Sequence, residues 1–114
     1  MAALVSYVQR GDSLDYTPSS AVAAGDVVVV GDLLGVAVRD IPAGTLGSLL
    51  VEGVFDWPKA TGGGSAITGG DTVYWDVSEQ VATGTSSGNV KIGKAVPAGA
   101  SDSDTTVRAK LFQA

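Results

Sequence analysis

Residues 21–30 read AVAAGDVVVV, and residues 66–75 read AITGGDTVYW. The second stretch repeats the first after a shift of 45 positions (70 − 25), with the Gly-Asp pair in the same place. The similarity continues at a shift of 58 (93 − 35), so the second copy carries an insertion of 13 residues (58 − 45). The further matches pair LGVAV (34–38) with IGKAV (92–96), PAG (42–44) with PAG (97–99) and, loosely, EGVF (52–55) with AKLF (109–112). Two half-size copies predict one pseudo-symmetric fold, because neither half could close a core by itself.

Both copies have the pattern of β structure. β-branched and aromatic runs follow glycine-containing turns that recur about every ten residues, while apolar residues seldom keep helical spacing for more than a turn. The strands expected from this pattern are 27–30, 33–38, 49–55, 72–77, 90–96 and 106–112. We therefore predict an all-β fold, either a small β-sandwich or a partly closed barrel.

The chain divides into an N-terminal arm and one domain. Residues 1–16 lack a clear core-facing pattern and are expected to form an extended arm that ends in a turn. Residues 17–114 are expected to form a single β domain of two half-repeats, about 21–59 and 66–112. The glycine-rich segment 60–65 is the natural boundary between them, as a hinge or as a loop that needs positive φ.

The composition argues against an enzyme. The chain has no cysteine and no histidine, so thiolate metal sites, the usual neutral-pH general base and the commonest transition-metal ligand are all missing. We expect no catalytic residues, no metal site and no cofactor. A structural role for the protein is the better hypothesis.

Charge and hydropathy narrow the choice of partners. A net charge of −5, with seven basic residues scattered singly, argues against nucleic-acid binding. The N-terminus has neither a basic segment nor a long apolar run, so we expect no signal peptide and no membrane span. We expect the chain to be made in the cytoplasm. A mean hydropathy of +0.27 with 17% charged residues favours an oligomer or a protein that covers a host surface.

Several motifs have a simple structural explanation. The four Gly-Asp pairs are most simply turns in which the aspartate caps its own backbone. Segment 101–104, Ser-Asp-Ser-Asp, alternates oxygens as calcium loops do, but it lacks the glycine and the distal glutamate of an EF-hand. A surface loop is the better interpretation.

Four aromatic residues are candidate interface residues. Phe55 and Trp57 lie at a strand end that Pro58 terminates, where rings pack at the rim of a core or anchor a contact. Tyr74 and Trp75 are adjacent in a strand, so alternation lets only one of them face the core. Both alternatives, core and contact, are open for this set.

The order of these segments resembles one family along nearly the whole chain. AGDVVVVGDLLGVA (24–37), VEGVFDWPKA (51–60), GDTVYWD (70–76), IGKAV (92–96) and TVRAKL (106–111) are similar to the capsid cement, or head decoration, proteins of tailed phages and prophages. The resemblance implies a β-clip or β-tulip-like topology. It also implies a trimer that binds the major capsid protein on the outside of an expanded icosahedral head.

The implied role is that of a clamp that holds neighbouring capsid subunits together against the pressure of internal DNA. Leu4, Val5, Tyr7 and Val8 are the candidate capsid-binding residues, adding a strand to a sheet of a neighbouring capsid subunit. The expected location is the capsid exterior, after synthesis in the bacterial host cytoplasm.

Three other functions are alternatives. A carbohydrate- or host-binding β module would use Trp57, Tyr74 and Trp75 as stacking platforms. A β-clip nucleotide hydrolase would need clustered carboxylates and a phosphate loop, which the sequence does not show. A tail or baseplate component is separated from a head protein only by the family resemblance.

Overall fold

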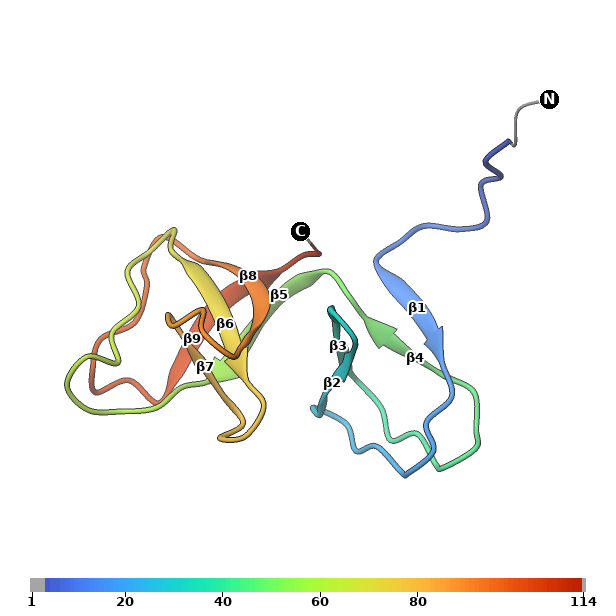
Figure 1. The fold of residues 1–114 in the computed structure, drawn as a ribbon, viewed down its shortest axis with the longest axis horizontal. Coiled ribbons are helices and arrows are strands. Elements are labelled where there is room, and N and C mark those ends of the chain that lie inside the picture. Colours follow the sequence, from blue (N-terminus) through green and yellow to red (C-terminus); the bar gives the residue numbers. More distant parts are fainter. Residues whose placement is uncertain (1–3, 114) are drawn as a thin grey trace.

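Two antiparallel sheets make up the fold. The computed structural model describes residues 4–113, in which every regular element is a strand. The first sheet has the order β1-β4-β3-β2 and the second the order β5-β9-β8-β6-β7. Figure 1 shows the sheets as two neighbouring lobes, with the N-terminal segment extending from the first. The strands are β1 Ser13–Tyr16, β2 Val27–Val30, β3 Leu33–Ala37, β4 Gly47–Leu50, β5 Gly53–Pro58, β6 Thr72–Asp76, β7 Val81–Thr83, β8 Val90–Ala95 and β9 Thr106–Leu111.

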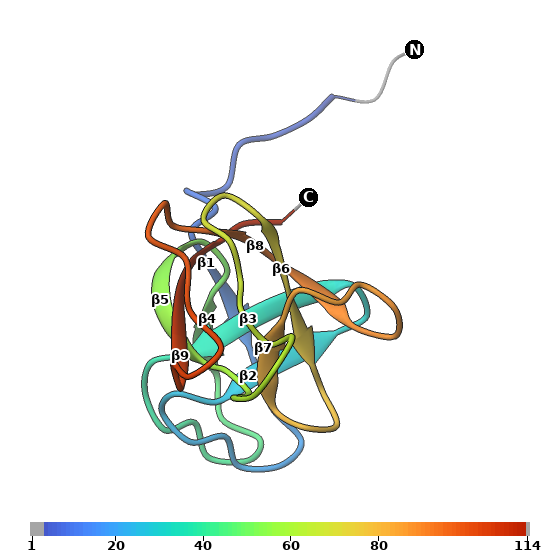
Figure 2. The same ribbon diagram turned by 90° about the vertical axis from the view of Figure 1, so that its left-hand side faces the viewer.

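The all-β class predicted from the sequence is confirmed, and the arrangement is sandwich-like. In Figure 2, β2 and β3 run across the direction of β5 and β9. The partly closed barrel is not formed. In the second sheet a single parallel bridge between Lys59 and Ala82 approaches closure, but β5 and β7 remain the edge strands.

The register confirms the repeat shifts of 45 and 58. Val28 in β2 lies opposite Gly35 in β3, and Val73 in β6 lies opposite Gly93 in β8. At both positions a side chain would meet a neighbouring strand, which explains why both are glycine. A Cβ at Gly35 would lie 2.9 Å from the Cβ of Leu49, and a Cβ at Gly93 would collide with the carbonyl oxygen of Lys110. The insertion of 13 residues in the second copy supplies β7 and the turn that follows it.

The Gly-Asp turns of the two copies also coincide. The amide of Gly25 donates to the carbonyl of Ala37 at 2.6 Å, and the amide of Gly70 donates to that of Ala95 at 3.0 Å. Both glycines have positive φ, 90° and 86°, which favours glycine over residues with a Cβ. The prediction that these pairs are turns is confirmed.

The third strand of the repeat differs from the match made in the sequence. Ala37 pairs with Leu49 and Ala95 pairs with Ala109, so the equivalent of β9 is β4 and not residues 52–55. The next strands then correspond as well, because Asp15 of β1 lies opposite Ser48 and Asp56 of β5 lies opposite Arg108. SLDY (13–16) and VFDW (54–57) are therefore structural equivalents.

This equivalence changes how the chain divides between the sheets. β1 lies within the predicted arm 1–16, but it pairs with β4 and belongs to the first sheet. β5 lies within the predicted half-repeat 21–59, but it is an edge strand of the second sheet. The sheets therefore divide at residues 51–52, and the predicted half-repeats do not coincide with them. Residues 1–3 of the predicted arm lie outside the described part of the chain.

The larger core lies between the sheets. The inner face of the second sheet is apolar because alternate residues of its strands point inward, as in β9, where Val107, Ala109 and Leu111 are buried. Leu34 and Val36 of β3 pack against this face from the first sheet. A smaller cluster of Ala37, Ile41, Leu49 and Val51 lies on the other face of the first sheet.

The C-terminal segment ties the two sheets together. The side-chain amide of Gln113 donates to the carbonyls of Leu34 at 3.1 Å and Val51 at 2.9 Å, and its oxygen accepts from the amide of Leu34 at 3.4 Å. Because Gln113 lies two residues after the end of β9, these bonds fasten the second sheet to β3 of the first.

Candidate functional site

The N-terminal segment is the most exposed apolar part of the described chain. Leu4, Val5, Tyr7 and Val8 are each at least 82% exposed. Figure 1 shows that the segment leaves the first lobe and runs away from both sheets. Its recorded attachment is slight, a bond of 3.2 Å from the Gln9 amide to the carbonyl of Ser13. Apolar side chains held in water in this way favour burial against a partner.

The segment leads directly into an edge strand. β1 pairs with β4 on one side and forms the edge of the first sheet on the other. The backbone N–H and C=O groups along a free edge can pair with a strand of another chain. We call residues 4–9, which carry the exposed apolar side chains and lead toward this edge, the N-terminal docking region, the candidate for a contact with a partner.

Two of the four candidate interface aromatics lie in the core. Trp57 and Trp75 are 2% exposed, with ring centroids 5.9 Å apart. The indole of Trp57 donates to the carbonyl of Ala109 at 3.2 Å, so its polar atom is satisfied inside the fold. Their burial gives these two rings a packing role in the folded chain.

The other two aromatics are partly exposed. Phe55 packs edge-on against Trp57 at 5.8 Å, on the rim of the core. Tyr74 is half-buried, whereas Trp75 faces inward, so the alternation expected for this pair is confirmed. Phe55 and Tyr74 keep the surface that a contact would need.

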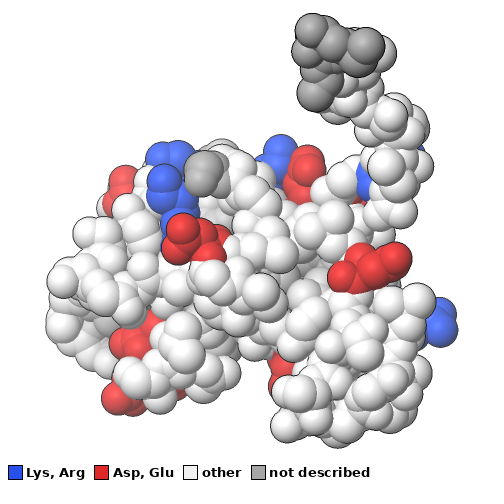
Figure 3. Space-filling model, turned by 45° about the vertical axis from the view of Figure 1, so that its right-hand side comes forward, with Lys and Arg blue, Asp and Glu red and all other residues white. Residues whose placement is uncertain are grey.

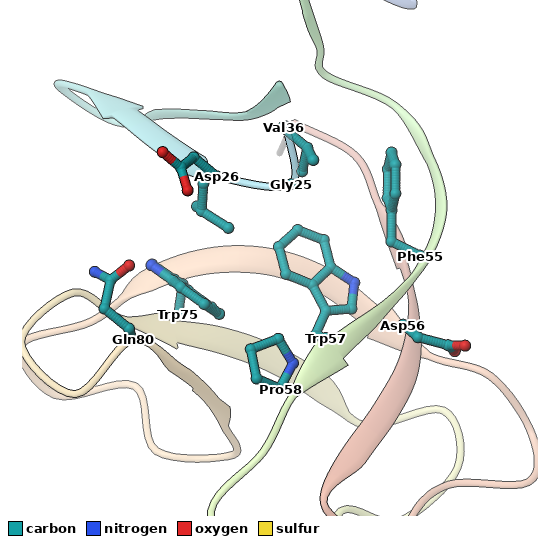
Figure 4. Close-up of a pocket in the computed structure, with 10 residues that line it drawn as sticks. Gly25, Asp26, Val36, Phe55, Asp56, Trp57, Pro58, Trp75 and Gln80 are labelled. Carbon is teal, nitrogen blue, oxygen red and sulfur yellow. The ribbon is translucent and has the colours of Figure 1, made fainter. Parts of the chain in front are cut away.

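A pocket of about 340 Å³ lies between the sheets. Val36, Trp57 and Trp75 form its apolar part, and Figure 4 shows Asp26 and Asp56 on opposite sides of the indoles. The two carboxylates therefore do not form an acid-base pair. In residues 4–113 no group of three or more potential metal ligands comes together.

Two carboxylates on strands of the second sheet, Asp56 of β5 and Asp76 of β6, serve the fold. Asp56 accepts two bonds from Arg108, at 2.8 and 3.1 Å, and the hydrogen-bonded guanidinium lowers the pKa of Asp56. Asp76 accepts bonds from the amides of Glu79 and Ser78 in the turn after β6. The amide of Glu79 is the main reason that the pKa of Asp76 is lowered.

The predicted surface loop at 101–104 is confirmed as a capped loop. Asp104 accepts from the amide of Ser101 at 2.8 Å, and Asp102 accepts from the amide of Ala66 at 2.8 Å. Each carboxylate therefore caps a backbone amide.

The sequence analysis missed Lys59, which is 5% exposed. Its ammonium group donates to the carbonyls of Ala60 at 2.7 Å and Asp104 at 3.1 Å, and to the hydroxyl of Ser65 at 3.3 Å. These bonds hold the glycine-rich segment 60–65 against the loop 101–105. Gly62 and Gly64 have φ of 113° and 83°, so the segment is a loop built on positive φ. No signal in the sequence marks Lys59 as buried.

The sequence analysis also missed a basic surface. Lys91 and Lys94 of β8 and Arg108 and Lys110 of β9 are all exposed. Lys94 lies directly opposite Lys110. Figure 3 shows Lys and Arg side chains gathered on the lobe opposite the N-terminal segment. The alternation of Arg108 and Lys110 was the available signal, but the partner strand could be identified only from the fold.

The described residues contain no helix long and apolar enough to cross a membrane. A family model described as phage cement protein matches residues 8–111. Comparisons with curated proteins and with solved structures found no match. The matched range begins within the N-terminal docking region and ends at the last residue of β9.

Proposed function

Because the chain belongs to the phage cement protein family, which is structural rather than enzymatic, we propose that it clamps neighbouring major capsid subunits against the pressure of internal DNA. Membership implies association with capsid proteins and a place in the virion capsid. Within that role, we place the chain on the outer surface of an expanded icosahedral head. Its synthesis takes place in the bacterial host cytoplasm.

The exposed N-terminal docking region is the observation that supports this proposal most strongly. Leu4, Val5, Tyr7 and Val8 extend from an edge strand whose outer side is free. A sheet of a capsid subunit that accepts this segment as an added strand would satisfy its backbone groups and bury alternate side chains. Each apolar side chain that becomes fully buried contributes on the order of 1.5–3 kcal/mol before the cost of ordering the segment.

The rest of the chain acts as a rigid body that joins such contacts. We propose that it binds as a homo-oligomer, a trimer, so that several N-terminal segments engage neighbouring capsid subunits at once. Linked contacts have a high effective concentration for one another, so all of them must break before the joint opens. The clamp therefore needs no bond stronger than those of an ordinary interface.

The carbohydrate-binding alternative depends on exposed aromatic platforms. Trp57 and Trp75 are buried in the core, and the ring of Tyr74 is only half exposed. The burial of these two tryptophans therefore counts against the three-ring platform that this alternative needs. The match to a cement family favours a head protein over a tail or baseplate component.

Co-sedimentation with purified capsids of a phage that encodes the chain tests the proposal. Expanded shells without cement are mixed with increasing amounts of the protein, and unexpanded shells serve as the control. We expect saturable binding to expanded shells at a fixed ratio to the major capsid subunit. Absence of binding to both kinds of shell would overturn the proposal.

A further inference from the structure

The outer face of the second sheet concentrates positive charge in an acidic protein. Four of the seven basic residues of the chain lie on β8 and β9, and all four are exposed. We call Lys91, Lys94, Arg108 and Lys110 the basic face. The rest of the chain carries three basic residues and twelve acidic ones.

The basic face is poorly neutralised within the chain. Lys94 and Lys110 are directly opposite on neighbouring strands, an arrangement that is destabilising for like charges. Lys94 donates to the hydroxyl of Thr72 at 2.6 Å, which leaves its charge uncompensated. Within the described residues the ion pair is that between Arg108 and Asp56. An acidic partner would remove the repulsion between the two lysines.

The first half of the same chain is more acidic than the second. Residues 1–52 contain six carboxylates and two arginines, a net charge of −4, whereas residues 53–114 contain six carboxylates and five basic residues, a net charge of −1. Asp12, Asp15 and Glu52 are exposed on the first lobe. The amide of Val51 donates to the carbonyl of Asp12 at 3.0 Å, which brings Asp12 and Glu52 to the same end of β1. We call these three carboxylates the acidic edge.

We infer that the basic face of one copy docks on the acidic edge of a second copy. The two surfaces lie on different lobes, so the contact is heterologous, and its repetition forms a ring where the rotation between copies closes. The inference rests on the self-association included in the proposed function, and it adds the surfaces that make the contact. Charge complementarity of this kind orients the encounter and fixes its register.

A nucleic acid is the less favourable occupant of the basic face. The chain carries −5 overall, and six of its carboxylates lie in residues 53–114 together with the basic face. Binding to a phosphate backbone depends on a sufficient number of cations, and only three lysines here are free of an ion pair with a carboxylate. A protein surface with three carboxylates matches that number.

The test is a charge swap read by light scattering in the absence of capsids. The double variant Lys94→Glu/Lys110→Glu reverses the charge of two of the four residues of the basic face. The variant Arg10→Glu/Arg39→Glu makes the same change of net charge on the first lobe and is the matched control. The quadruple variant Asp12→Lys/Asp15→Lys/Lys94→Glu/Lys110→Glu exchanges the charges of two residues on each surface and restores the wild-type net charge. Circular dichroism and thermal unfolding establish that each variant is folded.

We expect the wild type and the control to be oligomeric, the double variant to be monomeric at the same concentration, and the quadruple variant to be oligomeric again. A folded double variant that keeps the oligomer overturns the inference, and so does a quadruple variant that stays monomeric.

Loss of capsid binding without loss of the oligomer also overturns it and assigns the face to the shell. A shift of labelled DNA that depends on Lys94 and Lys110 assigns the face to nucleic acid. A monomeric wild type refutes self-association itself, while binding of that monomer to capsids would leave the cement role intact.

Discussion

The two sheets share one register but carry different side chains at equivalent positions. Val36 and Leu50 of the first sheet correspond to Lys94 and Lys110 of the second, because the pairings Val36–Leu50 and Lys94–Lys110 occupy the same place. On this face the first sheet packs through Val36 against its neighbour, whereas the second faces solvent. A duplicated backbone can therefore present one face as core and the equivalent face as surface.

The two sheets also differ in how much of the core they hold and in what they expose. The second sheet holds both tryptophans and most of the larger core, whereas the first adds a smaller cluster and the N-terminal docking region. The comparison suggests a division of work in which the second sheet anchors the fold and the first makes the external contact. The predictions below test that division.

The largest effect is expected at the equivalent pair Trp57 and Tyr16. Trp57→Ala removes a ring that is 2% exposed and should cost about 3–5 kcal/mol of unfolding free energy, through lost burial and the cavity left behind. Tyr16→Ala removes a half-buried ring beside the smaller cluster and should cost less than half as much. Denaturant unfolding of both variants measures the difference. Equal losses would show that the first sheet contributes to the fold as strongly as the second.

An intermediate effect is expected where the two sheets are fastened. Gln113→Ala removes the side-chain bonds to Leu34 and Val51 and should cost about 1–2 kcal/mol, because these backbone groups lose a partner. Gln9→Ala removes a single exposed bond on the N-terminal segment and is the matched control. Thermal unfolding measures both. A loss at Gln9 as large as that at Gln113 would contradict the role of Gln113 in joining the sheets.

The smallest effect concerns pH. The guanidinium of Arg108 lowers the pKa of Asp56 below its usual 3.8. The stabilisation is therefore present above pH 3.8 and is lost as the pH falls through the lower folded value. Because the pair is on the surface, the change in stability should be small.

Arg108→Gln should raise the pKa of Asp56 toward 3.8, measured by NMR titration of its carboxyl carbon. The pKa of Asp76 should stay low in the same variant, because its main cause is the amide of Glu79. An unchanged Asp56, or a shift shared by both carboxylates, would refute the assignment.

Much of the fold was readable because it depends on local pattern. The Gly-Asp turns, the β-branched runs and the glycines at 35 and 93 recur in order, so the sequence predicted the all-β class and the repeat shifts. The equivalence of β1 and β5 was missed because SLDY and VFDW share only an aspartate. The two strands correspond in their backbone pairing, and many different side chains are compatible with the same pairing.

The surfaces were less predictable because they depend on contacts distant in sequence. Lys94 and Lys110 are 16 positions apart (110 − 94) and become neighbours only when β8 pairs with β9. The burial of Lys59 requires acceptors from two loops that the sequence does not place together. The exposure of Leu4, Val5, Tyr7 and Val8 was consistent with the predicted arm, but their binding to a capsid stays a prediction.

The most direct test of the account compares capsid binding and folding in a chain that lacks residues 1–10. Co-sedimentation with expanded shells measures the first, and denaturant unfolding measures the second. The account predicts that binding is lost while the unfolding free energy stays within about 0.5 kcal/mol of the wild type, because residues 4–10 are exposed. Undiminished binding by the truncated chain would contradict the central claim that the N-terminal docking region attaches the protein to the capsid.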